Sequence, residues 1–428
     1  MTIPLASLSR TDLEAELDRA HAAYQDFASR GLALDITRGK PGTDQLDLSA
    51  DLLTAVTGDS YTSPAGTDTR NYGGLDGLPE LREMFGELLK VPAGNLLAQG
   101  NSSLVLMGQA LTFALLHGTT NEGSTPWVTG PRRILCPVPG YDRHFTLAES
   151  LGFELVSVPM DAEGPVLSEV ARLAGSDPSV KGMWVVPMYS NPTGVTISEA
   201  RARELLALET AAPDFRLLWD NAYGLHHLRE PQAELLDVLA LAAEVGHPER
   251  VWTFASTSKI THAGAGVGFF GANDMEVDWF RAHLGPTAIG PDKVNQLRHL
   301  RFFGDAAGVR AHMERHAALI GPKFDAVEEI LGTQLSGTGV AEWTSPKGGY
   351  FITLAVLPGI ASRVVKLAAE AGVKLTPAGA THPYGVDPDD AIIRIAPTMP
   401  GLADVRTATE GLAACVRLAA CEKLLAEG

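Results

Sequence analysis

The sequence predicts an α/β protein in which a mainly parallel β-sheet is flanked by helices and joined to a smaller α+β domain. Between about residues 75 and 260, short apolar segments of strand length alternate with segments of helical period, which is the pattern of a mainly parallel sheet. The strand segments are apolar at nearly every position, as strands covered on both faces are. After about residue 305 the alternation gives way to a long helical stretch and a few strands separated by turns.

The elements follow in chain order. Residues 9–12 cap a first helix that Gly31 ends, and a short strand (LALDIT) and a Gly/Pro loop (TRGKPG) come next. In the alternating region we expect helices at 78–89, 101–118, 144–152 and 198–209, and strands at 132–140, 153–160, 181–190, 215–224 and 250–259. Beyond it we expect helices at 308–332 and 362–372 and strands at 348–356 and 391–397. We therefore assign a large domain to residues 53–304 and a small domain to residues 1–52 and 305–428.

Composition excludes several classes of function. The net charge of −17 argues against non-specific binding to nucleic acid or to an anionic membrane. No apolar stretch reaches the ~18 residues of a membrane span, and the first residues do not have the pattern of a signal peptide. The three cysteines, Cys136, Cys415 and Cys421, form neither a disulfide framework nor a zinc site. We expect a cytoplasmic protein without a structural metal.

Lys259 ends the strand-like run VWTFASTSK and is the first candidate for a catalytic residue. A lysine at the end of a buried strand is costly as a purely structural residue, because its charge is desolvated. Conversion to an imine with a carbonyl compound removes that cost and gives the lysine a chemical role. The neighbouring Ser256 and Ser258 are able to donate hydrogen bonds to a phosphate. An SxSK string alone is a weak signal.

Three polar residues follow two earlier strand segments. Asp220 and Tyr223 lie in LLWDNAYG, and Asn191 lies in NPTG. In isolation the aspartate is a cap or turn residue, and NPTG is a turn. As a set they offer a carboxylate that keeps a pyridine nitrogen protonated, together with a phenol and an amide that bind an adjacent ring oxygen.

Three further segments fit the same site. Ser102 and Ser103 open the helix at 101–118, where they are either plain caps or part of a phosphate site at a helix N-terminus. Tyr141, in PVPGYDRH, is either ordinary packing or a ring that stacks on a bound aromatic group. Arg394 interrupts the apolar run AIIRIAP and needs an anionic partner, which is either a protein carboxylate or the carboxylate of a substrate.

In this order and spacing, N-P-T-G, D-x-x-Y and S-x-S-K resemble the fold-type-I pyridoxal-phosphate aminotransferases over nearly the whole chain. The resemblance is strongest to the aspartate-aminotransferase-like branch that also supplies the effector domain of MocR-type regulators, here without the DNA-binding domain. It implies a mainly parallel sheet of the seven-stranded type, pyridoxal 5′-phosphate as cofactor, and an amino group passed between an L-amino acid and a 2-oxo acid such as 2-oxoglutarate. Among the amino acids, it favours aspartate or another dicarboxylic acid.

The resemblance also implies a role for each matching residue. Lys259 is expected to bind the cofactor as a Schiff base and to move the substrate proton. The other expected roles are Asp220 at the pyridine nitrogen, Asn191 and Tyr223 at the 3-oxygen, Tyr141 stacked on the ring, Ser102, Ser103, Ser256 and Ser258 at the phosphate, Tyr72 reaching the phosphate of a neighbouring subunit in a homodimer, and Gly39 and Arg394 at the substrate carboxylate.

One position departs from the family pattern, which places a phosphate-binding arginine seven or eight residues after the lysine. Gly266 stands near that place, so backbone N–H groups of the glycine-rich turn or a basic residue from elsewhere must neutralise the phosphate. A dicarboxylic substrate needs a second cation as well. The candidates for it are Arg38, Lys40, Arg70, Lys293 and Arg298.

Three alternatives remain open from the sequence. A β-lyase on the same scaffold is the nearest enzymatic alternative, because a fold does not fix the reaction. A regulatory module of the MocR type is the alternative from another class, but the chain has no room for a winged-helix domain before its first helix. A protein that keeps the fold without the cofactor is the third.

Overall fold

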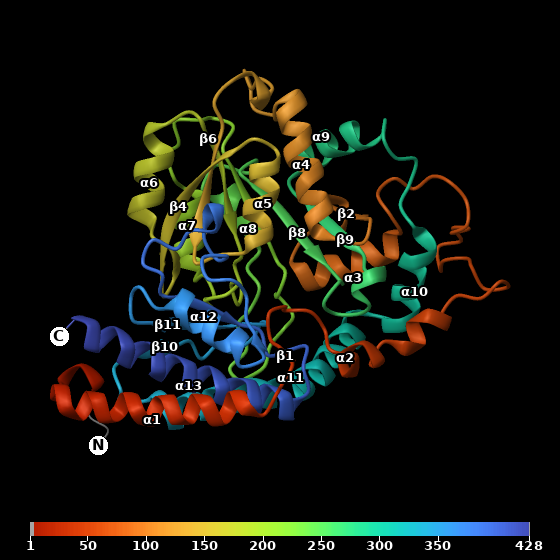
Figure 1. Ribbon diagram of the computed structural model, residues 1–428. Helices are drawn as coiled ribbons and strands as arrows, with labels where there is room; N and C mark the ends of the chain where they lie inside the picture. The colour runs from red at the N-terminus through yellow and green to blue at the C-terminus, as the bar shows by residue number, and fades with distance from the viewer. Residues whose placement is uncertain (1–3, 428) are drawn as a thin grey trace.

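A computed structural model describes residues 4–427, and its centre is an eight-stranded β-sheet (Figure 1). The strand order is β2-β9-β8-β7-β6-β3-β4-β5. β9 and β5 run antiparallel to their neighbours, and the remaining strands share one direction. The strands are β2 (Leu96–Gln99), β3 (Arg133–Val138), β4 (Glu154–Asp161), β5 (Gly164–Pro165), β6 (Val180–Val185), β7 (Arg216–Asp220), β8 (Val251–Ser256) and β9 (Gly268–Gly271).

Alternate residues of these strands pack against helices on opposite faces of the sheet, as the period of two requires. On β7, Leu218 packs with one group of helices, whereas Leu217 and Trp219 pack with the other. The first face is covered by α4 (Ser103–His117), α5 (Asp142–Ser150) and α9 (Asp274–Leu284). The second is covered by α3 (Pro79–Leu89), α6 (Leu167–Ser176), α7 (Glu199–Leu206), α8 (Val238–Glu244) and α10 (Lys293–Phe303). The predicted α/β fold class with a sheet covered on both faces is confirmed.

A second hydrophobic core joins the two ends of the chain. Its antiparallel sheet has the order β10-β11-β13, and β1 pairs with β12 in parallel. These strands are β1 (Leu34–Asp35), β10 (Ala341–Trp343), β11 (Ile352–Val356), β12 (Val373–Lys374) and β13 (Ile392–Ile395). The helices are α1 (Arg10–Ser29), α2 (Thr43–Asp47), α11 (Ala306–Leu335), α12 (Ala361–Glu370) and α13 (Leu402–Glu427), and α1, α11 and α13 lie side by side (Figure 1). The predicted smaller α+β part is therefore present.

The polar segments lie where the parallel strands end. Asp220 is the last residue of β7, and Lys259 follows β8 by three residues. Tyr141 and Asn191 come shortly after β3 and β6, which are neighbours in the same sheet. Because parallel strands present their carboxyl ends at one edge, the topology gathers these side chains from distant parts of the chain. Within residues 4–427, the helices include none that is both long and apolar enough to cross a membrane.

Candidate active site

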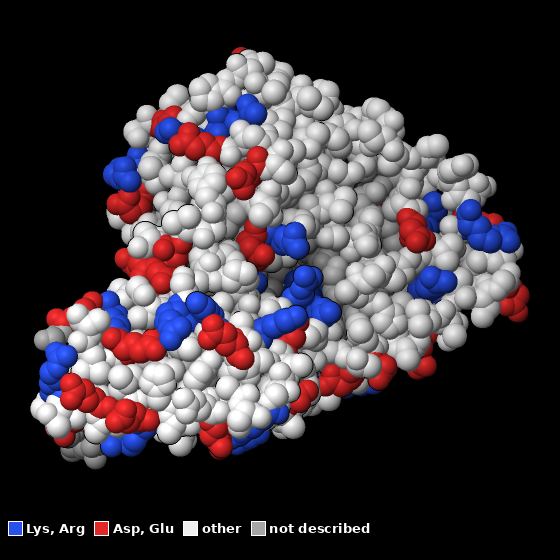
Figure 2. Space-filling model, viewed as in Figure 1, with Lys and Arg blue, Asp and Glu red and all other residues white. Residues whose placement is uncertain are grey.

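A cavity of about 530 Å³ lies at this edge of the large sheet. Its walls come from both parts of the molecule, with Lys259 and Tyr223 on one side and Phe351 and Arg394 on the other. The remaining lining residues are Thr37, Arg38, Gly39, Lys40, Tyr141, Asp142, Arg143, Asn191, Lys374, Leu375, Thr376 and Pro377. Figure 2 shows Lys and Arg side chains gathered around a hollow near the centre of the molecule.

Lys259 is partly buried in the turn that follows β8. Its Nζ atom lies 4.9 Å from the centre of the Tyr223 ring. Burial lowers the pKa of the Lys259 ammonium, and the negative charge of Asp220 opposes that shift. A lysine with a lowered pKa is more often neutral, which is the form that attacks a carbonyl carbon.

Asp220 is buried, and among the described residues only one of its two carboxylate oxygens has a partner. Oδ2 lies 3.0 Å from Nε2 of His144, whose ring stacks on Trp184 at 4.3 Å between ring centres. Oδ1 has no hydrogen-bond partner among residues 4–427. A buried carboxylate oxygen without a donor is costly, so this atom is suited to a donor from a bound molecule.

Asn191 and Tyr223 are both buried beside the cavity. The Asn191 Oδ1 atom accepts a 3.4 Å hydrogen bond from Arg394, but within the described chain its Nδ2 group has no acceptor. Burial raises the pKa of the Tyr223 phenol well above its ordinary value, so the hydroxyl keeps its proton and is able to donate. The Asn191 amide and the Tyr223 hydroxyl are thus two hydrogen-bond donors beside the cavity, and they are suited to bind an anionic oxygen.

Tyr141 forms another wall as the residue that caps α5. Its ring meets His144 edge-on, with 4.9 Å between ring centres and an interplanar angle of 76°. Burial raises the pKa of Tyr141 to about 12. The structure thus brings Tyr141 into the same cavity as Lys259, and it shows a residue that the sequence does not predict, His144, in contact with Asp220 and Tyr141. Its position three residues after Tyr141, on the first turns of a helix, is the signal that was available.

The serine residues form a second cluster, next to the turn that contains Lys259. The Ser258 hydroxyl donates to the Asn101 carbonyl at 3.0 Å and accepts from Ser256 at 3.1 Å. Ser102 caps α4 by accepting from the Leu104 N–H, and Ser103 is the first residue of that helix. The plain capping role of Ser102 is therefore present, and the hydroxyl cluster lies at a helix N-terminus where anions bind well.

Gly266 adjoins this cluster and leaves no room for a side chain. A Cβ atom there would lie 2.9 Å from the Asn101 carbonyl oxygen and 3.1 Å from the Ser258 Oγ atom. The Asn295 side chain fixes this turn by donating to the carbonyls of Ala265 and Gly266. The close contact explains why glycine stands where the family pattern has arginine.

Gly39 and Arg394 lie together on the wall formed by the second core. A Cβ atom on Gly39 would come within 2.2 Å of the Phe351 ring, so only glycine fits. Arg394 is buried and pairs with Asp142 at 3.0 Å, while its guanidinium carbon lies 5.0 Å from the centre of the Phe351 ring. The protein salt bridge that we considered is present, and the Arg394 Nε atom has no partner within residues 4–427.

Four cations that line the cavity have no ion-pair partner among residues 4–427. Arg38, Lys40, Arg143 and Lys374 are exposed, and none of the four forms an ion pair in the described part of the chain. Arg38 and Lys40 were candidates for a second carboxylate site, whereas Arg143 and Lys374 were not anticipated. Arg70 and Lys293 lie in a separate pocket with Tyr72, and Arg298 does not line the cavity.

Tyr72 is 82% exposed and does not line the cavity of its own chain. An aromatic side chain that is this exposed is suited to contact with another molecule. The sequence-based expectation that it acts in a neighbouring subunit stays a prediction.

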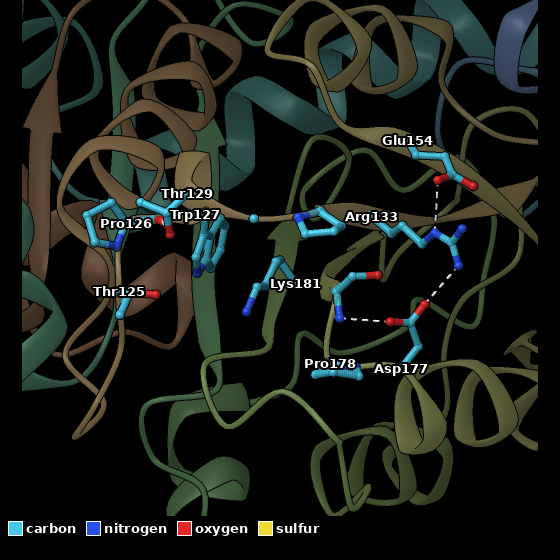
Figure 3. Close-up of a pocket in the computed structure, with 12 residues that line it drawn as sticks. Thr125, Pro126, Trp127, Thr129, Arg133, Glu154, Asp177, Pro178 and Lys181 are labelled. Carbon is cyan, nitrogen blue, oxygen red and sulfur yellow. Dashed lines mark hydrogen bonds and ion pairs between the residues drawn. The ribbon is translucent and has the colours of Figure 1, made fainter.

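A second cavity of about 480 Å³ lies at the opposite edge of the sheet, at the amino ends of β3 and β6 (Figure 3). Its charged groups are already paired. Arg133 contacts Glu154 at 2.9 Å and Asp177 at 2.8 Å, and Lys181 contacts Asp214 at 2.9 Å. Satisfied ion pairs leave no free charge for a ligand, so this cavity is the weaker candidate.

His299 is buried behind the turn that contains Lys259, and we expect it to make the stability of the protein depend on pH. The His299 Nδ1 group faces the Asn295 carbonyl at 2.8 Å, its Nε2 faces the Thr261 hydroxyl at 2.9 Å, and burial lowers its pKa to about 4. In the unfolded chain a histidine binds its proton near pH ~6.5. Neutral His299 therefore contributes fully to the free energy of unfolding above that pH. As the pH falls toward 4, this contribution is lost by about 1.4 kcal/mol per pH unit.

Urea unfolding between pH 7 and pH 4 tests this expectation. The variant His299→Gln should be less stable at pH 7, but its free energy of unfolding should fall less steeply below pH ~6.5. Equal slopes for the variant and the original chain would show that His299 does not titrate as the buried geometry requires.

Comparison with known proteins places this arrangement in one family. Residues 8–427 match the family described as "Aspartate amino-transferase". The chain is 47% identical to an aspartate aminotransferase of Corynebacterium glutamicum, over 98% of each chain. It superposes on the crystal structure of an aspartate transaminase from that organism with a TM-score of 0.96 and 46% identity, covering 99% of this chain and 100% of the other.

More distant structures share the fold alone. One is LysN, an α-aminoadipate aminotransferase from Thermus thermophilus complexed with N-(5′-phosphopyridoxyl)-L-leucine. Its TM-score is 0.70 at 19% identity, and the match covers 96% of this chain and 98% of that one. The fold and the matches over nearly the full length agree with the resemblance inferred from the sequence motifs. The chain is an aminotransferase and belongs to the aspartate aminotransferase family.

Proposed function

We propose that this aminotransferase uses pyridoxal 5′-phosphate bound at Lys259 and passes an amino group between a dicarboxylic amino acid, such as aspartate, and a 2-oxo acid, such as 2-oxoglutarate. The observation that carries the proposal is the half-satisfied carboxylate of Asp220 close to a lysine whose pKa is lowered by burial. The phosphopyridoxyl adduct named for LysN and the aspartate aminotransferase of Corynebacterium glutamicum also support it.

The residues present fit the cofactor. The Oδ1 atom of Asp220 lacks a donor within the described residues, and a protonated pyridine nitrogen would supply one. Asn191 Nδ2 lacks an acceptor there, and the cofactor's 3-oxygen would supply one beside the Tyr223 hydroxyl. When bound, the cofactor supplies an electron sink for the pair released from the substrate α-carbon.

The protein side of the chemistry follows from these positions. Asp220 holds a proton at the ring nitrogen, and His144 orients its carboxylate through the 3.0 Å contact at Oδ2. Lys259, in its neutral form, would accept the proton of the substrate α-carbon and return it to the cofactor's C4′ carbon, on the far side of the connecting nitrogen. Tyr141, which lines the cavity, would cover one face of the cofactor ring and exclude water from it.

The phosphate is held without the arginine that the family pattern has at this place. We assign its binding to Ser102, Ser103, Ser256 and Ser258 and to backbone N–H groups at the start of α4 and near Gly266. The hydroxyl cluster and the absence of space at Gly266 support this assignment. Tyr72 is proposed to reach the phosphate of a second subunit in a homodimer, which its exposure supports.

Substrate selection is proposed to depend on two sets of cations. Arg394, buried and beside Gly39, binds the α-carboxylate through its planar guanidinium. The unpaired cations at the mouth of the cavity (Arg38, Lys40, Arg143 and Lys374) attract the distal carboxylate of a dianionic substrate, against the net charge of −17.

Removing two of these cations should change selectivity more than turnover. For the double variant Arg143→Gln/Lys374→Gln, the KM for aspartate should rise by about tenfold, because each exposed pair contributes roughly a threefold factor. The KM for alanine, which has no second carboxylate, should stay within about twofold, and the difference should shrink in about 0.5 M salt. Arg30→Gln, in an exposed pair with Asp26 on α1, is the control. Equal changes for aspartate and alanine would remove these residues from substrate selection.

The domain division, the location in the cell and the kind of partner are also proposed. The division into residues 53–304 and residues 1–52 with 305–428 is supported by the core that joins the two ends of the chain, although the start of α11 packs with the large sheet. Residues 1–3 and 428 lie outside the described part. Three unpaired, buried cysteines support a reducing, cytoplasmic location. The acidic net charge supports small-molecule substrates and no nucleic-acid or membrane partner.

Product analysis tests the proposed reaction. Purified protein loaded with pyridoxal phosphate is incubated with a panel of amino acids and 2-oxoglutarate, and glutamate and the new oxo acids are measured. We expect glutamate in amounts equal to the oxo acid formed, most rapidly with aspartate. Pyruvate and ammonia without glutamate would instead assign the chain to β-elimination.

A further inference from the structure

The backbone carbonyl of Lys259 is held by two buried side chains. The Tyr350 hydroxyl lies 3.2 Å from this oxygen, and His226 Nε2 lies 3.3 Å from it. A carbonyl only accepts, so both groups are donors. Lys259 lies beyond the end of β8, in a turn where the sheet no longer fixes the backbone. These two side chains therefore help to fix the lysine's main chain, together with the N–H groups of Ile260 and Thr261, which both donate to the Thr257 carbonyl at 2.9 Å.

Tyr350 is itself held by Gln45, which is completely buried. Gln45 Nε2 donates to the Tyr350 hydroxyl at 2.9 Å and lies 3.1 Å from His316 Nδ1. Its Oε1 atom accepts from the Gly42 N–H at 3.1 Å. All the hydrogen-bonding atoms of the Gln45 amide thus have partners, as a buried amide requires.

These contacts form a continuous path between two parts of the cavity. Gly42 ends the loop at residues 37–42, and Arg38, Gly39 and Lys40 of that loop line the cavity. From Gly42 the hydrogen bonds run through Gln45 and Tyr350 to Lys259. The path joins α2 and the segment before β11 to the turn after β8, so it crosses between the two hydrophobic cores.

We propose that Gln45 and Tyr350 are positioning residues, which hold the backbone of Lys259 in register with the substrate loop at residues 37–42. The inference rests on the proposed function in one respect, that Lys259 is the reacting lysine. Proton transfer depends on the distance between Lys259 Nζ and the substrate carbon, and a displacement of about 1 Å can cost on the order of 10²-fold in rate. Loss of the bridge should therefore lower kcat and leave ground-state binding nearly intact.

Steady-state kinetics of Tyr350→Phe and Gln45→Met test the bridge. Each change preserves most of the side-chain volume and removes the hydrogen-bonding group. Tyr24→Phe is the matched control, because the Tyr24 hydroxyl also donates to a backbone carbonyl at 3.2 Å, that of Leu367, away from the cavity. Thermal unfolding of each variant separates a loss of stability from a loss of rate.

We expect Tyr350→Phe and Gln45→Met each to lower kcat by about tenfold with KM within about twofold, and the double variant to be no slower than the slower single variant. Tyr24→Phe should change neither constant. The inference is overturned if Tyr350→Phe keeps kcat within about twofold of the original, or if the two single effects multiply. If Gln45→Met does not fold, Tyr350→Phe decides alone. Absence of transamination in the unmodified chain would instead reject the proposed function.

Discussion

Replacing Lys259 by alanine should abolish turnover, with a fall in kcat of at least about 10⁴-fold, the upper end of what one positioned acid–base group contributes. Two roles are lost together, the covalent attachment of the cofactor and the transfer of the α-proton. The measurement is the rate of glutamate formation from 2-oxoglutarate and aspartate, alongside the visible absorbance of the lysine-bound cofactor. Both should disappear while the thermal unfolding transition remains cooperative.

Lys181→Ala is the control for this experiment. Lys181 is the second residue of β6 in the same sheet and pairs with Asp214 at 2.9 Å, but it lines the cavity at the opposite edge (Figure 3). Its replacement should leave the absorbance band and kcat in place. If Lys259→Ala kept the band and a substantial rate, another lysine would be the attachment site.

The second large effect is expected for Asp220→Asn. The amide has nearly the same shape as the carboxylate and is able to keep the contact with His144, but it carries no charge to hold a proton on a pyridine nitrogen. Loss of one preorganised electrostatic partner typically costs on the order of 10²–10³ in kcat, and we expect an effect of this size. The cofactor should still attach to Lys259, because the lysine itself is unchanged.

Asp214→Asn separates this effect from a general loss of stability. Asp214 is equally buried and accepts hydrogen bonds from Trp127 Nε1 at 2.7 Å and from Lys181 at 2.9 Å, far from the cavity. This variant should unfold at a lower temperature while its folded form keeps its kcat. A similar loss of kcat in both variants would mean that Asp220 acts through folding and not through the cofactor.

The fold class was predictable because alternating strand and helix segments dictate a sheet covered on both faces. Strands β3, β7 and β8 lie within predicted segments, and β4 and β6 each extend one residue beyond theirs. β9 was not anticipated, since its sequence GFFG lies in a stretch that reads as a glycine-rich turn. The structure gives the reason for its glycines. A Cβ atom on Gly268 would lie 3.0 Å from the Gln99 carbonyl oxygen, and one on Gly271 would lie 2.8 Å from Thr253 Cγ2.

Much of the candidate site was predictable for a related reason. Lys259, Asp220, Asn191 and Tyr141 all follow strands of one parallel sheet, so the topology alone brings them to one edge. The sequence motifs that contain these residues supported the prediction of their individual roles. Tyr72 was predicted as a site residue but does not line the cavity of its own chain, and its proposed role requires a second subunit.

The site residues that could not be predicted from the sequence are those that act through tertiary contacts. His144 touches Asp220 across the chain, and Gln45 reaches Lys259 only through Tyr350, which is more than 300 residues further along the sequence. Arg143 of α5 and Lys374 of β12 line the same cavity because the fold brings two distant segments of the chain to it. A charged residue at such a position has the same local pattern as an ordinary surface residue, so its sequence carries no signal.

The most direct test of the account is to locate the lysine that binds the cofactor. Protein supplied with pyridoxal phosphate is reduced with borohydride, digested, and analysed by peptide mass spectrometry. We expect one phosphopyridoxyl adduct, on the peptide that contains Lys259, and no adduct there when Lys259→Ala is treated in the same way. An adduct confined to another lysine, or none at all, would contradict the central claim.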